Sequence, residues 1–535
     1  MPHPAPASEF LPKIVTVWRE GYSLAALRAD AIAGVNVAIV ALPLSMAIAI
    51  ASGMGPEAGL YTTIVGGFLI SLLGGSRYQI GRPAGAMIVA VSACVAQIGV
   101  PGLMVAMFLS GLVLILAGAL RLGTYIKFLP YPVTIGFTSG IGVIIFVSQL
   151  KELLGLTLTT AEPPAVLDKL AVLWAARDSI APAALALALG TIVALQVIKH
   201  YRPRWPNMLI VVIGGSLLVW ALDLPVQLVG DRFGALPHFL PAPTLPDLSW
   251  PMLTQALPFA LQFSLLSAIT GLLSAQVADG LSGNRHRPAI ELFAEGTANM
   301  AVALFGGVVA TGAVARTVTN HGAGARGPVA GMLHAVIVLG FMMVLAPWVS
   351  FVPMAVFAGL LTVVAWNMAA RAQFRILLQT SRSDAVVVVV TFLLVVFRDL
   401  TEGIITGFAL GGLVFIQRMS QGTRVHHSTE THAERGDTVV VRLSGPYFFG
   451  AAAQVGAALD QIAERPAHFV LDLSDLTYLD SSGARSLELL ARNIMRRGGQ
   501  MELRAVTAPQ RRSLEKAGLT TPLVRYLDPP PLVPG

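Results

Sequence analysis

Long apolar runs recur along most of this chain, and they constrain its fold more than any other feature. They include residues 31–50, 103–120, 135–150, 184–198, 330–345 and 385–397. A helix needs roughly 20 such residues to cross a bilayer, and several runs reach that length with their flanks. Only 12% of the residues are charged, whereas a soluble protein has about 25%. Too few polar residues remain to enclose the runs, so we predict a multi-pass membrane protein.

Fourteen hydrophobic segments are predicted between Ala29 and Ser420, two of them short and broken by Gly or Pro. The polar stretch at 1–28 lacks a small-residue cleavage site, so the first segment is predicted to be a transmembrane helix rather than a signal peptide. An even number of crossings places both termini on one side, where most Lys and Arg residues of the predicted loops lie. The positive-inside rule therefore predicts cytoplasmic termini. These loops also account for the formal net charge of +7, so no nucleic-acid partner is expected.

Two interrupted segments indicate an internal repeat. Leu-Leu-Gly-Gly at 72–75 and Leu-Phe-Gly-Gly at 304–307 each end an apolar helix, and a short extended stretch follows each. Next comes a helix of small residues with an Arg near its start, Arg82 in one case and Arg316 in the other. They are the third and tenth segments, so the fourteen divide into seven plus seven, with the second half inverted. Interrupted helices at corresponding positions of inverted halves point to a transporter binding site.

The composition changes after Ser420, where we expect the membrane domain, residues 29–420, to end. Residues 421–436 are polar and are predicted to be a linker. The three histidines of this linker lack Cys or acidic partners at ligand spacing, so no metal site is predicted there; they are His426, His427 and His432.

Alternating strand and helix patterns predict a small α/β domain at residues 437–528, followed by a tail at 529–535. The strands are expected at 438–443, 468–473 and 500–505, and the helices at 451–462, at 482–495 and near 510–517. Asp480 or Ser481 is predicted to cap the helix that begins near Ser482. A phosphorylated loop at Asp480-Ser481-Ser482-Gly483 is the alternative.

Several short motifs occur in an order and spacing that together are specific. In the membrane part they are Ala33-Gly34-Val35, Ala41-Leu42-Pro43-Leu44-Ser45-Met46-Ala47, Gly59-Leu60-Tyr61, Pro83-Ala84-Gly85-Ala86, Asp279 with Glu291 to Asn299, and Gly312-Ala313-Val314-Ala315-Arg316-Thr317. This set resembles the SulP family of sulfate permeases and their animal relatives, the solute-carrier-26 anion transporters. In the C-terminal part, Leu443-Ser444-Gly445-Pro446 and Leu479-Asp480-Ser481-Ser482-Gly483 are similar to STAS domains.

The resemblance implies an all-α membrane domain of fourteen segments in a seven-plus-seven inverted repeat with two half-helices. A STAS-type cytoplasmic domain, for which a cytoplasmic partner is possible, follows it. The resemblance also implies that a core domain slides against a gate domain, and that the protein forms a homodimer in a bacterial inner membrane. The substrate class that it implies is a small anion: sulfate, bicarbonate, a dicarboxylate or a halide.

The interrupted segments also have the physical properties of an anion site. The first N–H groups of two helices that meet inside the membrane point at one place, and each helix start carries about half a positive charge. Small residues let an ion approach these N–H groups, or alternatively permit tight helix packing; they are Ala84, Gly85, Ala86, Gly312, Ala313 and Ala315. Arg316 is the sharpest candidate, because an Arg at membrane depth costs roughly 2.5 to 3.5 kcal/mol unless it snorkels to the surface.

The remaining site candidates are Thr317, Thr270, Pro83 and Arg82. Thr270 shares one face of the eighth segment with Ser267 and Ser274, and it either lines the site or links helices. Arg82 stands where relatives usually have Gly, and a second cation would favour a doubly charged substrate.

We therefore predict a secondary transporter of a small anion, first of all sulfate, that works by alternating access. A dicarboxylate or bicarbonate is the alternative substrate, and a nucleobase carrier or a STAS-based sensor is the competing class. No coupling acid is present at Leu44, Ile50 or Thr270, and we expect Glu57 and Glu295 to lie near a membrane surface. No nucleophile–base pair and no metal-ligand spacing occurs, so neither an enzyme nor a cofactor is predicted.

Overall fold

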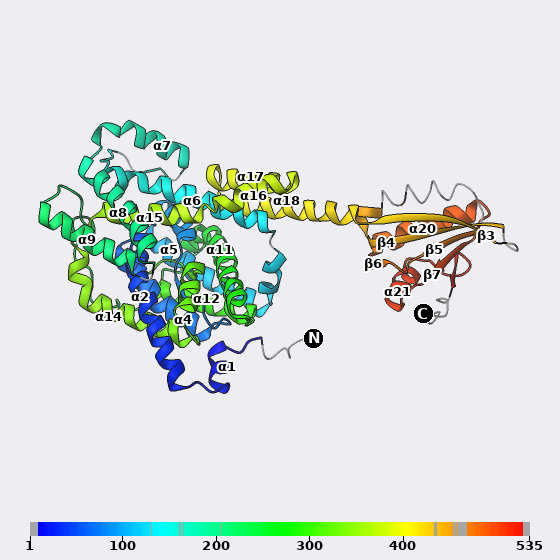
Figure 1. Ribbon diagram of the computed structural model, residues 1–535, viewed down its shortest axis with the longest axis horizontal. Coiled ribbons are helices and arrows are strands. Elements are labelled where there is room, and N and C mark those ends of the chain that lie inside the picture. Colours follow the sequence, from blue (N-terminus) through cyan, green and yellow to red (C-terminus); the bar gives the residue numbers. More distant parts are fainter. Residues whose placement is uncertain are drawn as a thin grey trace. The chain divides into compact units, whose positions relative to one another are not determined.

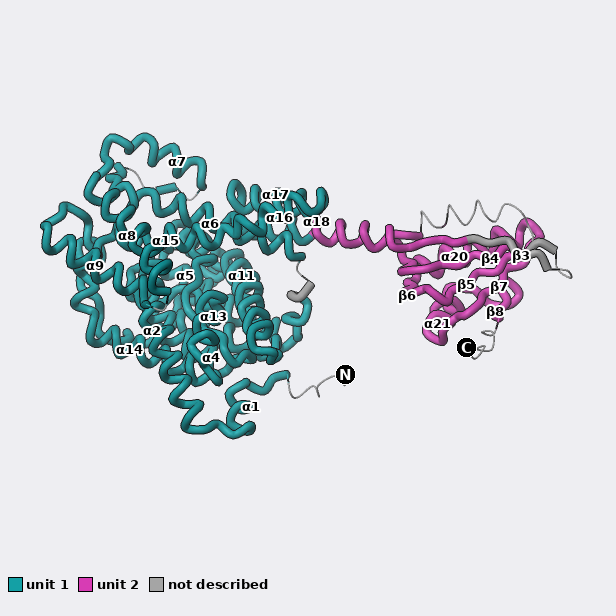
Figure 2. The backbone as a smooth tube through the Cα atoms, in the orientation of Figure 1, with its two compact units in different colours: residues 1–408 teal, residues 409–535 magenta. Residues whose placement is uncertain are grey.

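The computed structural model describes residues 9–128, 130–159, 162–163, 165–203, 205–432, 436–452, 456 and 468–527. It divides into two compact units, Met1–Phe408 and Ala409–Gly535 (Figure 2). Each unit has its own hydrophobic core, so we describe them separately.

Helices make up nearly all of the first unit, and the last of them continues past the end of the unit at Phe408 (Figure 1). They are α1 (Lys13–Arg19), α2 (Leu24–Ala51), α3 (Pro56–Tyr61), α4 (Gly67–Leu73), α5 (Ile88–Ala119), α6 (Tyr131–Leu154), α7 (Val166–Ala175), α8 (Pro182–Tyr201), α9 (Asn207–Leu222), α10 (Val229–Phe233), α11 (Trp250–Ser282), α12 (Pro288–Leu304), α13 (Val314–Gly322), α14 (Val329–Val349), α15 (Met354–Met368), α16 (Arg371–Thr380), α17 (Arg382–Phe397) and α18 (Leu400–Gln421). Two short strands, β1 (Gly81–Pro83) and β2 (Ala310–Gly312), interrupt them. Within the described residues, nine helical stretches are long and apolar enough to cross a membrane.

The helices follow the predicted seven-plus-seven order. A π-helical turn at Thr62–Gly66 joins α3 to α4, so these count as one segment. α5 counts as two, because Gly99 has a left-handed φ of 72° and Pro101 follows it. The first seven segments are α2, α3–α4, β1 with the start of α5, the rest of α5, α6, α8 and α9; the second seven are α11, α12, β2 with α13, α14, α15, α17 and α18.

Side-by-side packing sorts these segments into two groups, each of which mixes the two halves of the chain. In the core group, α5 packs against α11 and α12, and α14 packs against α2 and α4. In the gate group, α6 packs against α15 and α17, and α15 packs against α8. β1 and β2 belong to the core group, because they contact α2, α4, α11 and α12.

Ser23 starts α2 earlier than the sequence analysis predicted. The Ser23 hydroxyl accepts a hydrogen bond of 3.2 Å from the Ala26 N–H, so the helix begins at Leu24 rather than at 29. The short helix α1 precedes it and lies in the segment expected to be an N-terminal extension. Its N–H at Lys13 donates to the Gly74 carbonyl, which ties α1 to the end of α4.

A pair of glycines allows α5 and α12 to touch along their backbones. A Cβ placed on Gly111 would lie 2.5 Å from the Gly296 carbonyl oxygen, and one placed on Gly296 would lie 2.5 Å from the Gly111 carbonyl oxygen. Small residues at such crossings let membrane helices approach closely and gain van der Waals contact. This crossing fixes α12, which carries several buried polar side chains, against the core group.

Gly111→Ala is expected to lower the melting temperature of the purified protein in detergent. The new methyl group has no space, and overpacking a core typically costs about 1–3 kcal/mol. Gly214→Ala in α9 is the matched control, because nothing lies within 4 Å of a Cβ at that position. Equal melting temperatures for the two variants would contradict the close crossing.

The second unit is a mixed sheet with two described helices of its own. Its strands are β3 (Arg424–His432), β4 (Gly436–Tyr447), β5 (His468–Asp472), β6 (Leu476–Leu479), β7 (Met501–Arg504) and β8 (Val524–Leu527), and its helices are α20 (Ser481–Arg496) and α21 (Ala508–Lys516). The sheet order is β3-β4-β5-β7-β8, and β6 also pairs with β4. β3 is antiparallel to β4, and the other pairs are parallel. The strands and the helix predicted at 482–495 are confirmed, whereas most of the helix predicted at 451–462 lies outside the described residues.

The segment expected to be a linker contains strand β3, which corrects the sequence analysis. Val425 of this strand lies opposite Leu443 and packs against the core of the second unit. The strand was missed because it is rich in His and Thr and contains only one large apolar residue. Polar composition is common on edge strands, where it discourages pairing with other chains.

Asp480 caps α20, as one of the two predicted alternatives had it. Its carboxylate accepts from the Gly483 N–H at 2.7 Å and from the Phe449 N–H at 3.1 Å. Ser481 is the first residue of the helix. The motif therefore has a structural role that explains its residue types.

We expect residues 422–528 to fold as an isolated fragment and to be more stable than residues 437–528. The shorter fragment lacks β3, so it exposes the backbone N–H and C=O groups along the edge of β4. Circular dichroism and thermal unfolding of the two fragments measure the difference. A longer fragment that is unfolded, or no more stable than the shorter one, would contradict this assignment of the domain.

Candidate functional site

Strands β1 and β2 bring the two interrupted segments together. They are antiparallel, with Gly81 opposite Gly312 and Arg82 opposite Thr311. The Ala313 N–H extends the ladder by donating to the Ile80 carbonyl at 3.0 Å. Proline disfavours helix for the residue before it, so Arg82 is held extended and the helix can start only after Pro83. The sequence analysis predicted both extended stretches but not their pairing.

A helix begins directly after each strand. On one side, a 3-10 turn at Gly85–Met87 leads into α5, and on the other side Ala313 is the N-cap of α13. The first N–H groups of a helix have no acceptor within it, and they carry the positive end of the helix dipole. The strand pair therefore places two such ends beside one another.

The small residues at these helix starts have different neighbours. A Cβ on Gly85 would lie 3.3 Å from the Met368 sulfur and 3.6 Å from Cδ1 of Ile145, so Gly85 faces the gate group. A Cβ on Gly312 would overlap the side chain of Gln79, so packing inside the core group explains this glycine. Ala315 is exposed in the first turn of α13. Ala84, Ala86 and Ala313 are buried.

Arg316 and Arg82 are both buried beside this junction. Arg316 is 5% exposed; one terminal nitrogen lies 3.7 Å from the Met208 sulfur, and its Nε has no partner among the described residues. Arg82 is 6% exposed; one terminal nitrogen donates to the Pro83 carbonyl at 2.9 Å, and its Nε is likewise unpartnered there. Neither guanidinium forms an ion pair with a carboxylate in the described part of the chain. Two buried positive charges without a counter-charge are costly, and an anion between them would offset that cost.

His334 of α14 is a buried polar residue of the core group that was missed by the sequence analysis. Its side chain is fully buried, and a Cβ placed on Gly67 of α4 would lie 3.8 Å from Cε1 of its ring. Neither ring nitrogen has a hydrogen-bond partner among the described residues. A single His in an apolar run gave no periodic signal. The position of His334 follows from the packing of α14 against α2 and α4, which no local pattern encodes.

Glu295 lies against the strand pair, a position that the sequence analysis did not predict. It is fully buried in α12, and its Oε1 accepts from the Gly312 N–H at 3.1 Å. The same oxygen lies 3.4 Å from both Thr311 Oγ1 and Gln79 Nε2. A Cβ on Gly271 would overlap this carboxylate. Glu295 therefore holds β2 in place.

Asn299, one helical turn from Glu295, completes this support. Its side-chain amide donates to the Ala310 carbonyl and accepts from the Ala310 N–H, both at 2.8 Å. The spacing of four residues puts both side chains on one face of an otherwise apolar helix. This spacing could have indicated the pair from the sequence, because polar groups inside membrane segments are rarely without a role.

The predicted polar face of α11 contacts the tenth segment. Thr270 Oγ1 lies 2.9 Å from Thr311 Oγ1, and Ser274 Oγ lies 2.9 Å from Thr317 Oγ1. Thr317 also accepts a hydrogen bond of 3.3 Å from the Ile80 N–H. These hydroxyls join segments to each other. Of the three residues predicted to share this face, Ser267 and Ser274 are buried and Thr270 is partly exposed.

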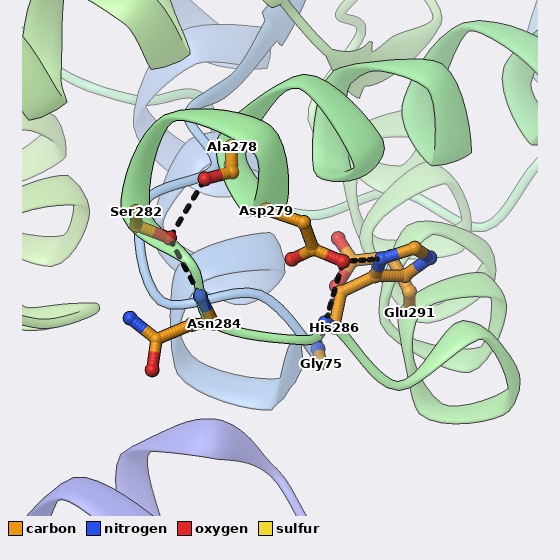
Figure 3. Close-up of polar contacts among 7 residues, drawn as sticks. All are labelled: Gly75, Ala278, Asp279, Ser282, Asn284, His286 and Glu291. Atoms are coloured by element: carbon orange, nitrogen blue, oxygen red, sulfur yellow. Dashed lines mark hydrogen bonds and ion pairs between the residues drawn. The ribbon is translucent and has the colours of Figure 1, made fainter.

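A second polar cluster fixes the connection between α11 and α12 (Figure 3). Asp279 at the end of α11 is 2.6 Å from Nδ1 of His286, and the Glu291 carboxylate accepts from the Gly75 N–H at 2.5 Å. Asp279 and Glu291 belong to the motif singled out in the sequence. Their contacts anchor the start of α12, and so they position Glu295 and Asn299 further along it. No group of three His, Cys, Asp or Glu side chains that could hold a metal ion occurs within the described residues.

The fold and this junction define a multi-pass membrane protein with two half-helices that face each other across a strand pair. A model of the sulfate permease family matches residues 27–391, and a model of the STAS domain matches residues 431–524. The chain therefore belongs to the sulfate permease family and carries a STAS domain. The predicted resemblance is confirmed.

Relatives with known names match nearly the whole chain. A putative sulfate transporter of Bacillus subtilis, YvdB, is 37% identical over 508 residues, which cover 94% of this chain and 95% of the relative. The bicarbonate transporter BicA of Synechocystis sp. is 30% identical over 92% of this chain and 90% of its own length.

Solved structures confirm the fold. The murine solute carrier 26 family member A9, an anion transporter in the inward-facing state, superposes with a TM-score of 0.85 at 19% identity and covers 99% of this chain and 94% of its own. The transmembrane domain of a cyanobacterial bicarbonate transporter BicA gives a TM-score of 0.64 at 29% identity, covering 73% of this chain and 98% of its own.

Asn299→Leu is expected to lower the melting temperature of the detergent-purified protein substantially. It leaves the buried N–H and C=O groups of Ala310 without partners, and each unsatisfied group costs about 1–3 kcal/mol. The control is Thr297→Val on the same helix, whose hydroxyl bonds only to the Phe293 carbonyl one turn back. A leucine variant as stable as the control would show that Asn299 does not hold β2.

Proposed function

We propose that this protein is a secondary transporter that moves sulfate across the membrane by alternating access. The observation that carries the proposal is a pair of buried guanidinium groups beside two helix starts, neither of which has a carboxylate partner among the described residues. Family membership and the names of relatives that match over the whole chain support the substrate class. Bicarbonate or a dicarboxylate is the alternative within the same class, and the named bicarbonate transporters among the relatives support keeping it.

Charge favours a dianion over a monoanion at this junction. Arg82 and Arg316 contribute two full positive charges, and the two helix starts add about half a charge each. Guanidinium groups present forked donors that match two oxygens of an oxyanion, and such charge-assisted bonds are roughly twice as strong as neutral ones. Sulfate supplies four equivalent oxygens and two negative charges. We therefore place it between Arg316, Arg82 and the N–H groups that follow Pro83 and Ala313.

Thr317, Ala315 and Thr270 have secondary roles in this proposal. Ala315 and the N–H groups of the first turn of α13 would contact the ion, because this turn is exposed on one side. Thr317 is fully buried, and its hydroxyl is already bonded to Ser274, so it positions α13. Thr270 is partly exposed, and it lines the site while its hydroxyl steadies Thr311.

Alternating access requires that the site move relative to one wall. The strand pair and its supports, Glu295 and Asn299, all belong to the core group. At the start of α5, Gly85 faces the gate group, and its neighbours there are the apolar side chains of Ile145 and Met368. An apolar contact has no directional bonds to break, and it therefore supports sliding of the core group against the gate group.

We further propose cytoplasmic termini, a homodimer and, for a bacterial chain, a location in the inner membrane. The positive loops favour this orientation. The STAS domain would then lie in the cytoplasm, where it can meet a soluble partner. We propose no catalytic activity, since the family consists of transporters.

Binding of sulfate to the purified protein tests the site. Arg316→Ala should weaken sulfate binding about tenfold or more, because hydrogen bonds that involve a charged group are worth about 1.5–3 kcal/mol. Arg316→Lys should restore part of the affinity, since an ammonium lacks the fork. Arg82→Gly should weaken sulfate more than bicarbonate, because one cation and both helix starts remain.

The control for these variants is Arg326→Ala, which removes an exposed charge shortly after α13. It should leave sulfate affinity unchanged. Wild-type affinity in Arg316→Ala would overturn the site assignment. Equal losses of sulfate and bicarbonate binding in Arg82→Gly would assign Arg82 a structural role only.

A further inference from the structure

A groove of about 500 Å³ lies on the gate group, away from the strand pair. Four elements form it: α6, α15, α16 and α17. Its walls are almost entirely apolar, and aromatic rings dominate them; those used below are Phe146, Trp366, Phe374 and Phe392. The floor is made by small residues, since a Cβ on Gly142 would lie 2.8 Å from the Ala365 carbonyl oxygen. An apolar groove of this volume accommodates a hydrocarbon chain.

The groove has one charged rim. Arg371 and Arg375 line it from successive turns of α16, and both are exposed. The Arg371 guanidinium lies 3.5 Å from the centre of the Trp366 ring, which holds it at the groove. Neither Arg371 nor Arg375 has an acidic partner among the residues that the structure describes, so both remain available for a ligand.

Helix α16 has the character of an interfacial helix. It buries Leu377 against Ile135 and Val388, and the Phe374 ring packs edge-on against Phe392 at 5.5 Å. Arg371, Phe374, Arg375 and Leu378 recur at spacings of three and four, so both arginines lie on the face of the helix that lines the groove. Arginine side chains on such a mixed face lay their aliphatic stems along the apolar surface and extend their charged ends toward the headgroups. The apolar groove then runs from the headgroup level into the hydrocarbon.

We infer that this groove binds one anionic phospholipid, with an acyl chain between α6, α15 and α17 and the phosphate on Arg371 and Arg375. Charge complementarity selects the occupant. A zwitterionic lipid offers the same chains, but its positive headgroup would lie against two cations. Basic residues near a membrane surface each contribute roughly 1 kcal/mol to binding of anionic lipid. The inference does not depend on the substrate that we propose.

The groove lies behind the wall that Gly85 touches. Ile145 and Met368 face Gly85, whereas their neighbours on the same helices, Phe146 and Trp366, line the groove. An acyl chain in the groove therefore supports α6 and α15 from behind. The lipid would stiffen this wall while the core group slides past it, so its loss should change the transport rate and leave substrate affinity unchanged.

Native mass spectrometry of the detergent-purified full chain tests this inference. The probes are phosphatidylglycerol and phosphatidylcholine with the same acyl chains. We expect the double variant Arg371→Ala/Arg375→Ala to bind phosphatidylglycerol at least tenfold more weakly and phosphatidylcholine with little change. Val143→Phe fills the groove from α6, where Val143 is half-buried, and should weaken both lipids.

The matched control is Lys199→Ala/Arg202→Ala, which removes two exposed cations at the end of α8 on the same predicted side of the membrane. It should leave phosphatidylglycerol binding unchanged. Equal losses of phosphatidylglycerol affinity in the two double variants would show that only general surface charge matters, and would overturn the assignment of the lipid site. Unchanged phosphatidylglycerol affinity in Arg371→Ala/Arg375→Ala would also overturn it. Sulfate binding, measured on the same samples, should stay at the wild-type value. The lipid measurement does not use sulfate, so it still tests the groove if the substrate assignment fails.

Discussion

The rest of the membrane unit depends on the backbone pairing of β1 with β2. Open strands inside a membrane are tolerated only where protein satisfies their N–H and C=O groups. The two strands form backbone hydrogen bonds with one another. The N–H groups of β2 that this pairing does not use donate to the side chains of Glu295 and Asn299. Without this ladder neither half-helix could begin at membrane depth. Its existence allows two positive helix ends and two arginines to share one place.

Polar side chains in the core group have two distinct tasks. Glu295, Asn299 and Thr62 are engaged with backbone groups of the segment that contains β2. Arg316 and Arg82 keep free donor atoms within the described structure. Hydrogen bonds from side chains to backbone groups make the segment rigid, whereas a buried donor without a partner gains free energy when it binds a ligand. Mutations at the two kinds of residue should therefore affect different properties.

The sequence revealed those features that depend on local patterns. Apolar runs gave the membrane class, Gly and Pro interruptions gave both half-helices, and period-two runs gave most strands of the second unit. Arg316 was identifiable because a charge in an apolar run is exceptional. The pairing of Arg82 with Thr311 joins residues far apart in the chain, and no local pattern encodes it. The positions of Glu295 and His334 could not be predicted for the same reason. Strand β3 was missed because its backbone pairing with β4 forms the strand, whereas its polar side chains give no apolar alternation.

The two inverted halves have matching elements but place their arginines differently. Arg82 lies in β1 before the proline, whereas Arg316 lies in the first turn of α13. The two guanidinium groups are therefore not related by the pseudo-symmetry that relates the helices. An ion at the junction is therefore held by two unlike cations, one fixed by extended backbone and one carried on a helical turn, so the charge of the site is asymmetric within a symmetric scaffold.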